Sequence, residues 1–107
     1  MENLDFDEGA KLLAVLANDK RLHILRIISR EETAVGELAE QVGLSQSALS
    51  QHLARLKSDA FVTTRRQAQN IFYPTSHPGV RRMLETLDDL QNESENTQHA
   101  VGSGSII

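Results

Sequence analysis

A glycine followed at once by a helix of small polar side chains, within residues 43–54, is the feature that most constrains the fold. Gly43 is able to adopt the positive φ that ends one helix, and Ser45 is placed to cap the next. At about 100° per residue, the leucines of this segment fall on one stripe. These leucines are Leu49, Leu53 and Leu56. The segment therefore predicts two helices joined by a tight turn, the second spanning residues 45–58.

The outward face of this second helix carries hydroxyls and amides where an ordinary surface helix carries Glu and Lys. Its members are Gln46, Ser47, Ser50, Gln51 and Ala54. Short donors and acceptors suit a helix that reaches base edges in a DNA major groove. We expect Gln46 and Gln51 to read bases, and Ser47 and Ser50 to bind phosphate or a base edge. The alternative is a solvated polar face, which Glu and Lys would serve better.

Length and composition exclude several classes of protein. The chain has 107 residues, 39% hydrophobic and 24% charged, which is typical of one globular domain. It contains no run of roughly 20 apolar residues that could cross a bilayer. Its acidic N-terminus is unlike a secretory signal, so we expect a cytoplasmic protein with no membrane partner. Because cysteine is absent, disulfides and thiolate metal sites are excluded.

The net charge of −4 is unevenly distributed along the chain. Residues 45–74 hold four basic side chains against one acidic side chain, whereas the charged side chains of residues 1–10 and 83–95 are all acidic. A basic middle between acidic ends is compatible with a surface that faces DNA. Ordinary scatter of solvated charge is the alternative interpretation.

Apolar periodicity predicts three helices before the turn. They span residues 9–17, Asn18 or Asp19 to Arg30, and 34–42. The first is apolar on nearly all sides, so it must be covered on all sides, and in so small a chain a second subunit is the expected cover.

The pattern then changes to one of β-branched and aromatic residues. Residues 61–66 and 70–73 predict a β-hairpin whose tip lacks the glycine that a tight turn prefers. A fifth helix is expected from Ser76, with an apolar stripe that ends at Leu90. We therefore expect one domain over residues 1–92 and a flexible tail over residues 93–107.

The apolar stripes of the first and fifth helices together predict the seam of a homodimer. The expected interface residues are Leu12, Leu13, Leu16, Val80, Met83, Leu84, Leu87 and Leu90.

The predicted order of elements, mainly α with a small β-hairpin (α-α-α-α-β-β-α), is that of a winged helix-turn-helix domain. Five segments carry a resemblance to a known family, namely residues 16–25 (LANDKRLHIL), 35–39 (VGELA), 43–47 (GLSQS), 49–53 (LSQHL) and 62–66 (VTTRR). Through them, residues 11–91 resemble the ArsR/SmtB family of dimeric bacterial transcriptional repressors, and in particular its cysteine-free members.

The resemblance implies a homodimer that binds a palindromic double-stranded operator, with the helix at residues 45–58 in the major groove and the hairpin, or wing, along the backbone. We expect a repressor without catalysis or cofactor, since no nucleophile–base arrangement is visible. The expected DNA-binding residues are Ser45, Gln46, Ser47, Ser50, Gln51, Arg55, Arg65, Arg66 and Gln69. Alternation along a strand favours only one of Arg65 and Arg66 as a phosphate clamp. Arg55 either contacts the DNA backbone or pairs with Asp59.

The chain departs from metal-sensing relatives of this family. Residues 34–36 read Ala-Val-Gly where those proteins often have a Cys-Val-Cys or Cys-Val-Gly, and residues 89–92 replace a stretch that ends in His-x-x-Glu. At the wing tip, Ala68 and Gln69 stand where many members have Gly-Arg, which weakens the expected phosphate contact. We therefore expect no metal site.

Histidines leave one alternative open, a metal site shared between subunits. His23 and His52 are interpreted as structural and His77 as a cap or an exposed residue. A metal-responsive repressor using His77, Asp88, Asp89 and Glu93, or one that responds to a small molecule at the dimer seam, is the first alternative. A winged-helix module that binds protein instead of DNA is the second. The effector, if one exists, is not identified by the sequence.

Overall fold

The computed structural model describes the backbone of residues 4–100 and the side chains of residues 4–93. Its elements are α1 (Phe6–Leu16), α2 (Asp19–Arg30), α3 (Val35–Val42), α4 (Gln46–Ser58), β1 (Arg65–Gln67), β2 (Asn70–Phe72) and α5 (Pro78–Ala100). The predicted order, four helices, a hairpin and a fifth helix, is confirmed. Over residues 4–100, no helix is long and apolar enough to cross a membrane.

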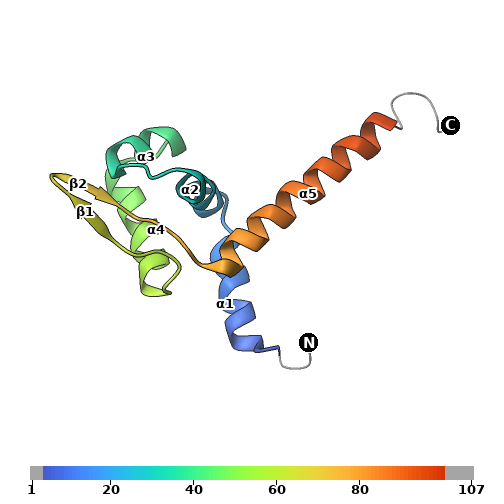
Figure 1. Ribbon diagram of the computed structural model, residues 1–107, viewed down its shortest axis with the longest axis horizontal. Coiled ribbons are helices and arrows are strands. Elements are labelled where there is room, and N and C mark those ends of the chain that lie inside the picture. The colour runs from blue at the N-terminus through green and yellow to red at the C-terminus, as the bar shows by residue number, and fades with distance from the viewer. Residues whose placement is uncertain (1–3, 101–107) are drawn as a thin grey trace.

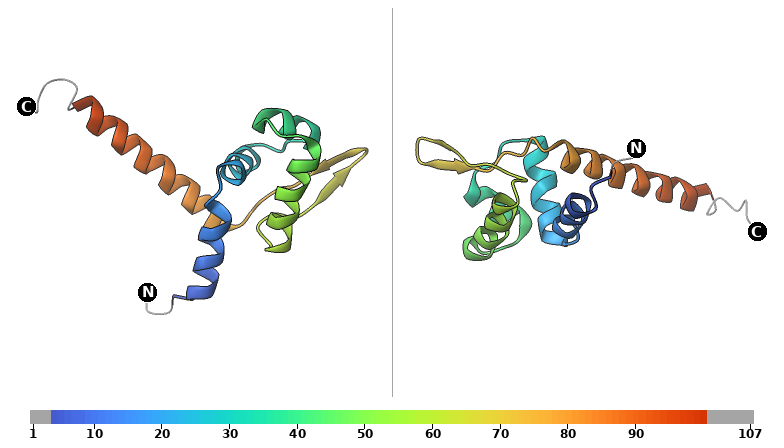
Figure 2. Two further views of the ribbon diagram at one scale, coloured as in Figure 1. Left: turned by 180° about the vertical axis from the view of Figure 1, so that it is seen from behind. Right: turned by 90° about the horizontal axis from the view of Figure 1, so that it is seen from below.

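Helix α2 is central and contacts α1, α3 and α5. The helices α3 and α4 lie with the hairpin at one end of the molecule, while α5 runs away from the other end (Figure 1). Figure 2 shows the same arrangement from behind and from below. The hydrophobic core draws side chains from the end of α1, from α2, α3 and α4, and from the start of α5. Its largest fully buried side chains are Ile24, Leu25, Leu38, Leu49, Leu53, Leu56, Val15 and Val80.

Side-chain caps fix where the helices begin. The Asp5 carboxylate accepts from the backbone N–H of Glu8 at 3.1 Å, so α1 begins three residues earlier than the expected start at Gly9. Asn18 caps α2 through the backbone N–H of Arg21 at 3.0 Å. Each cap gives a partner to an N–H that the helix itself leaves free.

The two helices α3 and α4 end in the same backbone motif. After α3, Gly43 has φ +70°, and the N–H of Leu44 donates to the Ala39 carbonyl at 3.0 Å. After α4, Ala60 has φ +64°, and the N–H of Phe61 donates to the Leu56 carbonyl at 2.9 Å. This six-residue closure is the Schellman motif, in which a left-handed residue follows the helix. One of the two positions holds glycine and the other holds alanine.

The hairpin is shorter than expected. Antiparallel pairing joins Arg65 to Phe72 and Gln67 to Asn70, with Ala68 at φ +56° in the two-residue turn. Residues 61–64 are not part of the ladder because Phe61 and Val62 turn into the core. The buried Thr75 hydroxyl donates to the Phe61 carbonyl at 2.7 Å, which holds this segment beside the residues that follow β2.

Helix α5 begins at Pro78 and ends at Ala100. The His77 imidazole Nδ1 accepts from the N–H groups of Gly79 and Val80, so His77 is a cap, as one of the two sequence interpretations had it. The helix passes the expected end at residue 92, because Glu, Gln and Asn can extend a helix without an apolar stripe and no Gly or Pro occurs between Gly79 and Gly102. Residues 93–100 of the expected flexible tail are thus helical, residues 101–107 lie outside the described residues, and the domain boundary at residue 92 stays a prediction.

Candidate nucleic-acid interface

The polar face of α4 is open to solvent. Five of its members are exposed, namely Gln46, Ser47, Ser50, Gln51 and Ala54. On the opposite side, Leu49, Leu53 and Leu56 are at most 2% exposed. The leucine stripe therefore anchors the helix and fixes its rotation. The structure places the predicted reading face outward as the sequence suggested.

Two contacts fix the start of α4 and the end of α3. Ser45 precedes α4 and accepts from the N–H of Ala48 at 3.1 Å, which confirms the predicted cap. The Lys20 ammonium donates to the Val42 carbonyl at 2.9 Å, at the end of α3 where the helix dipole is negative. Because Lys20 belongs to α2, this bond joins the helix-turn-helix to the central helix. The predicted DNA contact of Ser45 would use a hydroxyl that already accepts the cap bond.

Arg55 pairs with Asp59. Its Nε donates to Asp59 Oδ2 at 3.0 Å, so the structure shows the second of the two roles that the sequence left open. The Arg21 guanidinium lies close by and donates to the Val15 carbonyl at 2.8 Å. Burial lowers the pKa of Arg21 and nearby Arg55 lowers it further, while Asp59 raises it. The Asp59 charge thus partly offsets the repulsion between Arg21 and Arg55.

The two wing arginines differ in their surroundings. Arg65 is half-buried, and its Nε and Nη2 donate to the two carboxylate oxygens of Glu32 at 3.1 and 2.5 Å. Arg66 is exposed and has no side-chain hydrogen bond or ion pair among the described residues. Gln69, at the hairpin tip, is exposed as well. Of the two arginines, Arg66 is the one free to meet a phosphate.

Glu32 is a residue that sequence reasoning missed. It lies in the loop between α2 and α3, 33 positions from Arg65 in the chain. No local pattern joins the two residues, because only the packing of the hairpin against that loop brings them together. The sequence therefore contains no signal that could have predicted the Glu32–Arg65 pair.

The predicted dimer residues fall into three groups by exposure. Leu16, Val80 and Leu84 are at most 5% exposed within a single chain, so they belong to the core of the protomer. Leu13 and Leu90 are 56% and 54% exposed. Leu12, Met83 and Leu87 are half-buried. Two further apolar side chains that the sequence analysis did not select, Leu4 and Phe6, are 58% and 77% exposed.

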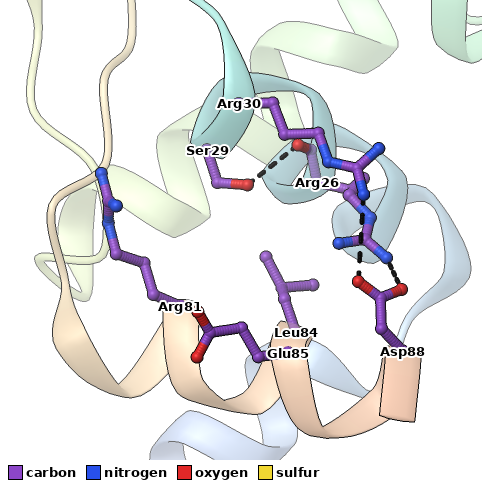
Figure 3. Close-up of a pocket in the computed structure, with 7 residues that line it drawn as sticks. All are labelled: Arg26, Ser29, Arg30, Arg81, Leu84, Glu85 and Asp88. Carbon is purple, nitrogen blue, oxygen red and sulfur yellow. Dashed lines mark hydrogen bonds and ion pairs between the residues drawn. The ribbon is translucent and has the colours of Figure 1, made fainter.

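An ion-pair cluster joins α5 to α2 (Figure 3). The Asp88 carboxylate of α5 pairs with Arg26 and lies 3.9 Å from Arg30, both on α2. The cluster borders a cavity of about 230 Å³ that Ser29, Arg81, Leu84 and Glu85 also line. Asp88 already has two cationic partners, so its surroundings in this chain do not support the alternative in which Asp88 is a metal ligand. Residues 4–93 contain no group of three side chains that could hold a metal ion.

Comparison with known proteins places this geometry in a family. Residues 18–64 match the model of the bacterial regulatory proteins of the arsR family. The nodulation protein NolR of Rhizobium meliloti is 48% identical over 89 residues, which cover 83% of this chain and 73% of that protein. The chain belongs to the ArsR family. The transcriptional activator HlyU of Vibrio cholerae is another relative, 49% identical over 79 residues, or 74% of this chain and 73% of HlyU.

Solved structures of ArsR-family proteins share the fold. The crystal structure of NolR from Sinorhizobium fredii has a TM-score of 0.75 at 45% identity and covers 84% of this chain and 96% of that chain. A homodimeric winged helix-turn-helix domain from Mycobacterium bovis, described as a possible ArsR-family regulator, has a TM-score of 0.71 at 27% identity over 87% and 92% of the two chains. This ArsR-family chain is therefore a winged helix-turn-helix regulatory protein and not an enzyme, as the sequence predicted.

Proposed function

We propose that this ArsR-family protein binds a palindromic DNA operator as a homodimer, with α4 in the major groove and the wing along the backbone. The observation that carries the proposal is the exposed, uncharged face of α4, held outward by a fully buried leucine stripe. Amide and hydroxyl groups on such a face are suited to hydrogen bonds with base edges. Each good bidentate pair between a side chain and a base contributes about 1–3 kcal/mol of discrimination against the wrong base.

Within this face, each side chain has a proposed role. Gln46 and Gln51 read bases, since a glutamine amide can pair with adenine through two hydrogen bonds. Ser47 and Ser50 bind a base edge or phosphate. Ser45 and Gln69 contact the DNA at the start of α4 and at the wing tip. The Arg55 Nε is already bonded to Asp59, which offsets its charge, so we assign Arg55 the smallest contribution to affinity.

The homodimer is supported by an apolar groove on α1. The groove has a volume of about 410 Å³ and is lined almost entirely by apolar side chains. Its lining residues are Leu4, Phe6, Gly9, Ala10, Leu12, Leu13 and Met83. Exposed apolar groups of this number on a small chain favour burial against another protein surface. The Mycobacterium bovis relative is described as homodimeric, which is consistent with a second copy as the cover.

The oligomeric state is measurable by sedimentation. We expect a mass of about 24 kDa at micromolar concentration, twice the chain mass of 11.9 kDa. Leu13→Glu, which places a charge in the groove, should shift the protein toward the monomer, whereas Lys11→Glu on an exposed neighbouring position should not. A wild-type monomer at that concentration would contradict both the dimer and the two-fold operator.

The DNA site itself is found by random-site selection of duplexes with the purified protein. Two-fold symmetry predicts a palindrome whose half-sites lie about one helical turn apart, roughly 34–36 Å. Selection of a single half-site, or of no motif at all, would contradict the proposal. We propose repression by occupancy of a promoter, and a reporter placed behind the selected site distinguishes it from activation, the role named for HlyU.

A further inference from the structure

The wing is attached to the body of the protein at its base through a side-chain pair and a backbone bridge, and a third contact inside the wing links the two. The Glu32 carboxylate receives two hydrogen bonds from Arg65, as described above. The Arg65 guanidinium lies 4.6 Å from the centre of the Phe72 ring. Phe72 in turn forms a β-bridge with Ala34. We call Glu32, Arg65 and Phe72 the wing latch.

Geometry explains why these three residues act together. Arg65 on β1 and Phe72 on β2 are direct partners in the hairpin register, so the guanidinium covers the ring across the two strands. Glu32 and Ala34 lie in the loop before α3, and thus both strands are fixed to the same short segment. A two-stranded hairpin is marginally stable alone in water, so its position depends on such attachments.

We propose that Glu32 is a positioning residue for DNA binding, which acts by holding Arg65 so that the wing is fixed before DNA arrives. Three of the five N–H groups of Arg65 are already engaged, two with Glu32 and one with Gln67 at 2.9 Å. Arg65 therefore acts through the position of the hairpin, and Arg66 supplies the phosphate contact. This inference rests on the DNA-binding function proposed above.

The competing hypothesis is that Arg65 is itself a phosphate clamp that Glu32 masks. The two hypotheses predict opposite signs for Glu32→Gln. If Glu32 masks a clamp, removing its charge frees Arg65 and strengthens binding. If Glu32 holds the wing, Glu32→Gln weakens binding by about threefold to tenfold, as expected for a bidentate surface ion pair reinforced by stacking.

Glu31→Gln is the matched control. Glu31 is the exposed neighbour of Glu32, and its side chain makes no hydrogen bond or ion pair among the described residues. Glu31→Gln removes the same charge as Glu32→Gln from the same loop, so it isolates the general effect of charge on DNA affinity. Binding by Glu32→Gln that is as tight as that of Glu31→Gln, or tighter, would overturn the proposal.

Substitutions at the two arginines give a second, independent readout. The slope of log affinity against log salt falls by about 0.9 for each phosphate contact that is lost. Arg66→Gln should reduce this slope, whereas Arg65→Gln should weaken binding with the slope unchanged. Arg65→Lys, which keeps the charge but not the planar fork, should weaken binding as Arg65→Gln does. A reduced slope for Arg65→Gln with near-normal binding by Arg65→Lys would refute the assignment.

A measurement without DNA keeps this inference separate from the proposed function. Amide hydrogen exchange of residues 65–72 in the free protein should be faster in Glu32→Gln than in Glu31→Gln, while exchange in α2 stays unchanged. Equal exchange in the two variants would overturn the latch whether or not the wild-type protein binds DNA. A latch that is confirmed in a protein that does not bind duplex would instead contradict the proposed function.

Discussion

Ala60 occupies a backbone conformation that suits glycine, and replacing it should stabilise the protein. Its φ of +64° lies in the left-handed region, where a residue with a Cβ carries a cost of about 1–2 kcal/mol. Glycine removes that cost but loses about 0.5–1 kcal/mol more conformational entropy on folding. We therefore expect Ala60→Gly to raise the free energy of unfolding by about 0.5–1 kcal/mol. In a domain of this size that corresponds to an increase in Tm of roughly 2–8 °C.

Gly43→Ala is the reciprocal test, because Gly43 holds the same position after α3. An added Cβ there would meet no atom closer than the Lys20 Nζ, at 4.0 Å, so the expected loss is conformational and not steric. We expect a loss of about 1 kcal/mol. Thermal unfolding of Ala60→Gly and Gly43→Ala at one protein concentration measures both changes in stability. If Ala60→Gly destabilises the protein or Gly43→Ala leaves it unchanged, the reasoning from φ is wrong.

Three further substitutions test other contacts of the fold. Thr75→Val removes the buried hydroxyl that donates to the Phe61 carbonyl and should cost about 1–3 kcal/mol in urea unfolding, since that carbonyl loses its partner. Asp88→Asn should lower the free energy of unfolding by up to about 1 kcal/mol, and high salt should diminish this loss. Asp89→Asn, on the exposed side of α5, should lower it by less. Equal losses in the two variants would argue against the pairing of Asp88 with Arg26. Leu53→Ala should cost about 2–5 kcal/mol because Leu53 is 2% exposed, and a loss below 1 kcal/mol would show that α4 is not anchored by its leucines.

Much of the fold was predictable because its signals are local. The leucine spacing of α4 and the glycine before it fix a buried stripe and therefore an exposed face, and both are found. The cap at Ser45 follows from residue type and position in the same way. These features depend on residues within four positions of each other, which is the range over which helix geometry acts.

The remainder depends on contacts that periodicity does not encode. Arg65 looked equivalent to Arg66 in the sequence, but only packing of the hairpin against the α2–α3 loop gives Arg65 the partner Glu32. Asp88 looked like a possible metal ligand until α5 and α2 were seen to place it beside two arginines. Leu84 looked like a dimer residue because an apolar stripe does not say whether the same chain or another covers it.

The most direct test measures how Gln51→Ala changes the preference for the selected operator over random duplex. The reading role of the α4 face predicts that this ratio falls by about fivefold or more, for a loss of at least 1 kcal/mol of discrimination, while the salt slope stays near the wild-type value. Gln41→Ala is the control, since the Gln41 amide lies on α3 and already donates to Glu37 at 3.2 Å. A Gln51→Ala protein that keeps the wild-type ratio would contradict base reading by this residue, and the same result for Gln46→Ala would leave the face without its proposed role.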